Sequence, residues 1–71
     1  MNPLVTLAYA DDIMQAHMMV GVLEVNGIKA AVEHGMITTM IPFVAKGVNV
    51  MVFESDFDAA RRIIEREFPG H

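Results

Sequence analysis

The alternation of apolar and polar side chains predicts three short strands. Residues 4–9 (LVTLAY) are rich in strand-forming types and follow directly after Pro3. Residues 28–33 (IKAAVE) and 48–53 (VNVMVF) place apolar side chains at every second position on one side. This period is typical of a strand with one buried face.

Two further segments repeat apolar side chains with the period of a helix. The first follows Asp11 and Asp12, either of which can cap the free N–H groups of its first turn, and Gln15 can complete a capping box. Asn26-Gly27 ends this helix, because glycine adopts the left-handed conformation without steric cost. Its expected buried stripe is Ile13, Ala16, Val20 and Leu23. Gly21 lies within this helix, where a glycine costs roughly 1 kcal/mol. Close approach of the helix to a strand would explain why a glycine occupies this position.

The second helix is expected after Ser55, with Ser55 as its N-cap and Asp58 near the positive end of the helix dipole. Pro69-Gly70 stops it. Its expected buried stripe is Phe57, Ala60, Ile64 and Phe68.

The order strand, helix, strand, strand, helix predicts one small α+β domain over residues 1–71, a two-layer ferredoxin-like plait without its last strand. We expect a three-stranded mixed sheet, with the first strand parallel to the third, the third antiparallel to the second, and both helices on one face. The first strand would then be an unprotected edge. The uncovered face would present Thr6, Ala8, Lys29, Ala31, Asn49, Met51 and Phe53.

Composition narrows the classes of function. The apolar share is 54%, which exceeds what a 71-residue domain can hide, so a homo-oligomer, most simply a dimer, is expected. There is no cysteine, which excludes disulfides and thiolate metal sites. No apolar run approaches the roughly 18 residues of a membrane span, and no signal peptide is recognisable, so we expect a cytoplasmic protein away from the membrane. The net charge of −4, with five Lys and Arg, disfavours nucleic acid.

Catalytic and metal chemistry find little support in the sequence. The carboxylate pairs Asp11-Asp12 and Asp56/Asp58 stand at helix starts, where capping explains them better than acid–base catalysis. The methionines suggest soft copper(I) ligands, but filling irregular apolar gaps explains them better. We therefore expect no enzyme activity, no metal and no cofactor.

The connection over residues 34–47 is unusually apolar, and a connection of about a dozen residues without regular structure tends to be functional. It could complete the core as a lid, contact another subunit, or grip a partner or ligand. The expected binding residues on this loop and the adjoining sheet face are Lys29, Glu33, His34, Met36, Met40, Ile41, Phe43, Lys46 and Met51.

Several segments resemble a known bacterial family. The strand ending in YADD, the helix with QAH and LEVNGI, and the stretch KGVNVMVFESDFDAARRII are similar to the family of putative prokaryotic signal transducing proteins. The resemblance covers nearly the whole chain and implies a PII-like fold, a regulatory role and a functional loop at residues 34–47. It implies no catalytic residues. Some members carry a cysteine-rich zinc appendage, which this cysteine-free chain lacks.

The leading hypothesis is a non-enzymatic regulatory or protein-interaction module that acts through residues 34–47 and the open sheet face. One alternative is a sensor of a small effector, of PII-like or amino-acid-binding type. Another is a structural subunit of a larger complex. The sequence identifies neither the protein partner nor the effector.

Overall fold

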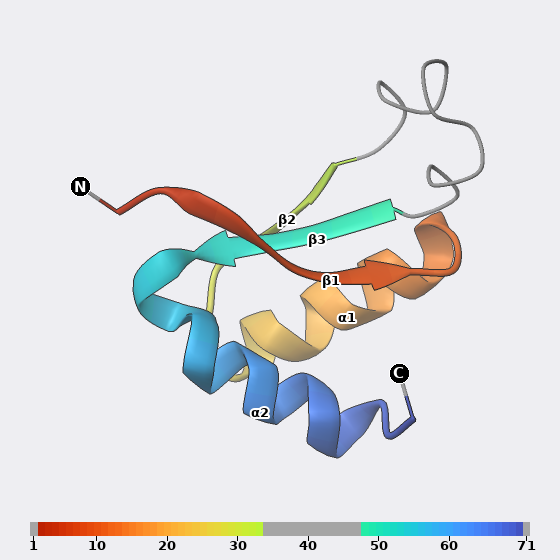
Figure 1. Cartoon of the computed structure of the whole chain (residues 1–71). Coiled ribbons are helices and arrows are strands. Elements are labelled where there is room, and N and C mark those ends of the chain that lie inside the picture. Colours follow the sequence, from red (N-terminus) through yellow and green to blue (C-terminus); the bar gives the residue numbers. More distant parts are fainter. Residues whose placement is uncertain (1, 34–47, 71) are drawn as a thin grey trace.

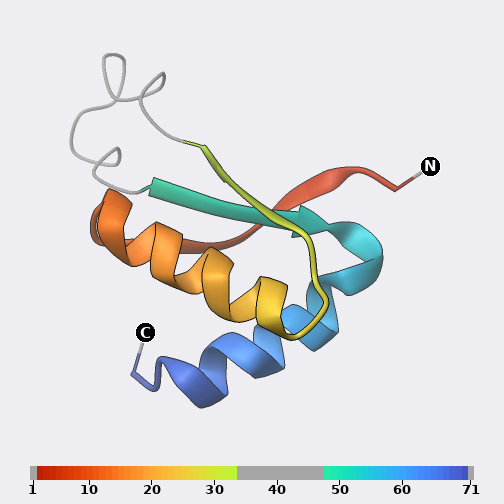
Figure 2. The same cartoon turned by 180° about the vertical axis from the view of Figure 1, so that it is seen from behind.

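The chain folds into two layers, a three-stranded sheet and a pair of helices that lie on one side of it (Figure 1). The computed structural model describes residues 2–33 and 48–70. Its elements are β1 (Leu4–Ala10), α1 (Ile13–Val25), β2 (Ala30–Glu33), β3 (Val48–Phe53), a 3-10 turn η2 (Glu54–Asp56) and α2 (Phe57–Glu67). The view from behind shows α1 and α2 side by side on the same face of the sheet (Figure 2). This arrangement confirms the predicted α+β architecture and is compatible with a ferredoxin-like plait.

The strands lie in the order β1-β3-β2, and both pairings are antiparallel. Each strand therefore lies beside the strands that were expected as its neighbours. The prediction of a mixed sheet is wrong, because β1 and β3 run in opposite directions. The crossover through α1 brings β2 back in the direction of β1 without placing the two strands side by side. The chain then reverses, and β3 fills the space between them antiparallel to both.

A β-bulge interrupts the pairing of β1 with β3 at Leu7. Thr6 pairs with Met51, and the next pair joins Ala8 to Val50, so Leu7 is the extra residue. Beyond the bulge the side chains of β1 exchange faces. Ala8 consequently lies on the helix side of the sheet, opposite a fully buried valine, and its predicted place on the open face is wrong.

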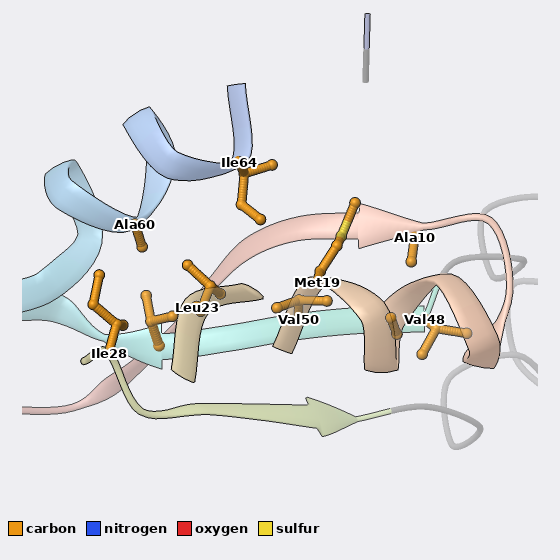
Figure 3. Packing of buried hydrophobic residues seen from close by; sticks show 10 residues of the cluster. Ala10, Met19, Leu23, Ile28, Val48, Val50, Ala60 and Ile64 are labelled. Carbon is orange, nitrogen blue, oxygen red and sulfur yellow. The ribbon is translucent and has the colours of Figure 1, made fainter. Parts of the chain in front are cut away.

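The core lies between the helices and the sheet (Figure 3). Its buried residues are Ala10, Ala16, Met19, Leu23, Ile28, Val48, Val50, Val52, Ala60 and Ile64. All are apolar, and no polar or charged side chain is buried in the part of the chain that the structure describes. The largest contributions come from Met19 and Leu23, which are fully buried and each stabilise the fold by about 1.5–3 kcal/mol through burial.

The buried stripe of α1 differs in part from the prediction. Ala16 and Leu23 are buried as expected, but Ile13 is 41% exposed and Val20 only partly buried. Met19 takes the central position instead. An unbranched, flexible methionine fills an irregular gap that the simple helical period does not anticipate.

The first turn of α1 is closed by side chains on both sides of its start. The backbone N–H of Gln15 donates to Oδ1 of Asp12 at 2.8 Å, and the side-chain oxygen of Gln15 accepts from the backbone N–H of Asp11 at 2.6 Å. Asp12 is therefore the N-cap, a role that the sequence alone did not assign to one of the two aspartates. At the other end Gly27 has φ 84°, as the predicted stop requires.

Gly21 has no packing reason for its lack of a side chain. No heavy atom lies within 4 Å of the position that a Cβ would occupy, and the residue is exposed. The predicted close approach to a strand is therefore wrong, because Gly21 lies on the side of α1 opposite its buried residues.

The start of α2 also differs from the prediction. Ser55 is not its N-cap: it lies in η2, and α2 begins at Phe57 after Asp56, whose side chain makes no capping hydrogen bond. The backbone N–H of Ser55 instead donates to Oδ1 of Asn2 at 3.1 Å, and that of Glu54 donates to the carbonyl of Pro3 at 2.8 Å. These bonds fix the N-terminal residues against the start of η2. Of the expected buried stripe, Ala60 and Ile64 are buried, while Phe57 at the start of α2 and Phe68 just after its end are half-buried.

The cap at Asp12 can be tested by comparing it with its neighbour. We expect Asp12→Ala to lower the free energy of unfolding by about 1 kcal/mol, because it removes the acceptor of the Gln15 N–H. Asp11→Ala should cost less than about 0.5 kcal/mol, since Asp11 contributes its backbone N–H to the box. Urea unfolding followed by circular dichroism measures both, and equal losses would contradict the assignment.

Candidate functional site

The candidate site is the face of the sheet that the helices leave uncovered, which we call the open sheet face (Figure 1). Side chains at directly paired positions share a face, so the pairing registers define its members. They are Leu4, Thr6 and Tyr9 of β1, Asn49, Met51 and Phe53 of β3, and Ala31 and Glu33 of β2. Leu4 is 47% and Tyr9 62% exposed, and the three β3 side chains are half-buried.

The open sheet face is graded from apolar to polar along the strands. Leu4 pairs with Phe53 at one end and forms an apolar row. In the middle, Met51 lies between Thr6 and Ala31.

At the opposite end the face becomes polar. Asn49 pairs with Tyr9 on one side and with Glu33 on the other. This row offers a phenol, an amide and a carboxylate across three neighbouring strands. The face therefore has an apolar area at one end and a polar border at the other.

The structure brings together some of the predicted site residues. Met51 and Glu33 share the open sheet face, in adjacent rows. Lys29 is exposed and directly precedes β2, at the other end of that strand from Glu33. The remaining predicted residues, His34, Met36, Met40, Ile41, Phe43 and Lys46, lie outside the described residues. The lid, interface and grip hypotheses for residues 34–47 therefore stay predictions.

Sequence reasoning missed Tyr9, the most exposed aromatic side chain of the face. Strict alternation along β1 groups Tyr9 with Val5 and Leu7, on the helix side. The bulge at Leu7 moves it to the open sheet face, opposite Asn49. The available signal is weak: Leu7, Ala8 and Ala10 are all apolar, so the alternation already fails after Thr6.

A comparison with known families identifies the chain's relatives. A family model described as putative prokaryotic signal transducing protein matches residues 4–67. The chain belongs to this family. The resemblance found in the sequence is thereby confirmed, and the family description supports a signal-transducing role without naming a mechanism. No curated protein and no solved structure matches the chain.

The matched span coincides with the folded unit. It begins at Leu4, the first residue of β1, and ends at Glu67, the last residue of α2. The family model thus includes every residue of the open sheet face, along with both helices that cover the other side.

A second surface feature lies beside the bulge, between β1 and α2. It is a hollow of about 270 Å³ lined by Leu7, Ala8, Phe57, Arg61, Ile64 and Glu65. Nε of Arg61 and Oε2 of Glu65 form an exposed ion pair at 3.0 Å within this lining. Ligand sites for drug-sized molecules usually measure about 300–1,000 Å³. This hollow is smaller, and the charges that line it already pair with each other.

No group of three or more His, Asp or Glu that could hold a metal ion occurs among residues 2–33 and 48–70. Asp12 is engaged as a helix cap. Within the same ranges, no helix is long and apolar enough to cross a membrane.

The assignment of faces along β1 predicts different roles for two of its leucines. Leu7 packs against the core, whereas Leu4 lies on the open sheet face. We expect Leu7→Ala to lower the free energy of unfolding by about 1–2 kcal/mol, somewhat below the value for a fully buried leucine, and Leu4→Ala to lower it by less than about 0.5 kcal/mol. Chemical denaturation of the two variants checks this. A larger loss at Leu4 would contradict the assigned faces.

Proposed function

We propose that the protein is a non-enzymatic interaction module in signal transduction, which binds a protein partner through the open sheet face. The observation that carries this proposal is the sheet side that the two helices leave uncovered, with exposed Leu4 and Tyr9 beside half-buried Met51 and Phe53. Apolar surface of this kind favours association by about 25 cal/mol for each Å² removed from water. Membership in a family described by signal transduction supports the same class of function.

The residue types on the face suit protein recognition. Tyr and Phe combine a large apolar area with few rotatable bonds, and they are enriched at protein interfaces. In the proposed complex, the Leu4–Phe53 row supplies the apolar contact. Tyr9, Asn49 and Glu33 supply hydrogen-bonding groups at the border. The partner surface would be apolar in its centre, with hydrogen-bond donors facing Glu33.

Side-chain docking on the face suits this sheet better than addition of a strand at its edge. The sheet has β1 and β2 as its edge strands. The bulge at Leu7 interrupts β1, and β2 contains 4 residues. Bulges and short strands both hinder edge-to-edge pairing. The edge of β1, which the sequence suggested as unprotected, is therefore a poorer partner site than the face beside it.

Two features bear on the alternative functions and the location. A small-effector sensor would need a site larger than the hollow beside α2, or one that includes residues 34–47. A purely structural subunit has no specific observation in its favour.

The absence of cysteine suits a reducing compartment, so we place the protein in the cytoplasm as part of the proposal.

Site-specific photocrosslinking in a bacterial host of this family tests the proposed face. A benzoylphenylalanine at position 9 should form a covalent adduct with a second protein, because Tyr9 is exposed at the border of the face. The same probe in place of Arg62, on the exposed side of α2, is the matched control and should form little adduct. Mass spectrometry of the adduct identifies the partner.

Affinity measurements with that partner complete the test. Tyr9→Ala should weaken binding by about tenfold, because it removes the most exposed aromatic side chain of the face. Arg62→Ala should leave the affinity unchanged. Equal adducts from positions 9 and 62, or no effect of Tyr9→Ala, would refute binding through the open sheet face.

A further inference from the structure

The outer side of α1 carries a second apolar surface, separate from the open sheet face. Met14 is 71%, Met18 57% and Val25 88% exposed. Gly21 lies between them, exposed and with nothing within 4 Å of its Cβ position. We call Met14, Met18, Gly21 and Val25 the outer stripe of α1.

The outer stripe follows a regular pattern. Its residues recur at i, i+4, i+7 and i+11, the spacing with which one helix packs along another. The buried residues Ala16, Met19 and Leu23 occupy the opposite side of the same helix. A helix that is apolar on both sides is normally covered on both sides. The sheet covers one side of α1, so the outer stripe lacks a covering layer within the described part of the chain.

The polar side chains that border the outer stripe indicate what covers it. His17 and Glu24 are both exposed, lie about two helical turns apart and border the outer stripe along the same side. In a parallel two-fold pair of α1 helices, the borders that carry His17 and Glu24 would lie on opposite edges of the contact and would not meet. In an antiparallel pair each His17 lies near the Glu24 of the other copy. The antiparallel pair also aligns the helix dipoles favourably.

We propose that two copies of this chain associate through an antiparallel contact between their α1 helices, with the two-fold axis close to Gly21. The contact is self-complementary, as a two-fold interface requires. Glycine at its centre lets the two backbones approach closely. The proposal does not rest on the partner site of the open sheet face, which lies on the other side of the molecule.

The composition of α1 argues against a lipid surface as the occupant. Helices that lie on membranes carry Lys or Arg on their polar side. α1 contains neither, and the chain has a net charge of −4, which anionic lipids repel. The neighbouring helix does not extend the apolar area, since its exposed side carries the ion pairs Arg61–Glu65 and Arg66–Glu67. The contact is thus centred on a helix of 13 residues.

Sedimentation velocity of the full chain tests the dimer. Because the contact is small, concentrations from about 10 µM to about 1 mM are needed. Met18→Glu should raise the dimer dissociation constant more than about tenfold, since each carboxylate would face the apolar stripe of the other copy. Leu4→Glu adds the same charge to the open sheet face and should leave the constant unchanged. Circular dichroism verifies that both variants fold.

Any other result in this experiment overturns the proposal. A wild-type chain that stays monomeric over the whole range removes the dimer. Loss of the dimer in Leu4→Glu but not in Met18→Glu moves the interface to the open sheet face. A stable dimer in both variants places it elsewhere.

The absence of cysteine allows the orientation of the helices to be tested separately. Gly21→Cys places a thiol next to the two-fold axis, within the distance that a disulfide between copies can bridge. Met14→Cys places it about two turns from the axis, so the two thiols of an antiparallel pair lie far apart. Mild oxidation at a concentration where the wild type dimerises should crosslink the first variant and not the second. Crosslinking of both, of neither, or of Met14→Cys alone refutes the antiparallel contact.

Discussion

The central strand β3 imposes the constraint on which the rest of the structure depends. Val48, Val50 and Val52 are all buried against the helix layer. Since successive side chains of a strand point to opposite faces, Asn49, Met51 and Phe53 have to point away from the helices. The two helices form a single layer, so they cover only one of these two faces (Figure 1). The open sheet face is therefore a direct consequence of how the core is built.

The second consequence concerns α1, which packs its small and flexible side chains inward and keeps others outward. Met19 fills the core while Met14 and Met18, on the same helix, remain exposed. The outer stripe and the open sheet face thus lie on opposite sides of a two-layer molecule. A dimer formed through α1 would leave both open sheet faces accessible and pointing away from the two-fold axis. Two such faces on one particle bind a bivalent partner more tightly than one face does, without any new contact.

The sequence predicted the elements and the helix layer because these depend on local patterns: alternation in β3, the cap at Asp12 and the stop at Gly27. It failed where a single residue changes the register. The bulge at Leu7 leaves only a weak signal in the sequence, because it depends on the fit of β1 against a strand far along the chain. Ala8 was therefore assigned to the wrong face, and Tyr9 was not recognised as part of the open sheet face. The mixed sheet was wrong for a related reason, since strand direction follows from the whole path of the chain. Six of the nine predicted site residues lie in residues 34–47, outside the described part.

The two proposed contacts are coupled through the stability of the domain. A chain of 71 residues buries only about 60% of the surface that its unfolded form exposes, so its folded state is marginal. Any partner that binds only the folded state stabilises it, and the gain grows with partner concentration. Met51 on the open sheet face and Val50 in the core are neighbours on the same strand, and Val50 belongs to one core cluster with Met19 of α1. Binding at either surface therefore stabilises the same folded core on which the other surface depends. Where folding is incomplete, binding at one surface favours binding at the other to the same extent in both directions.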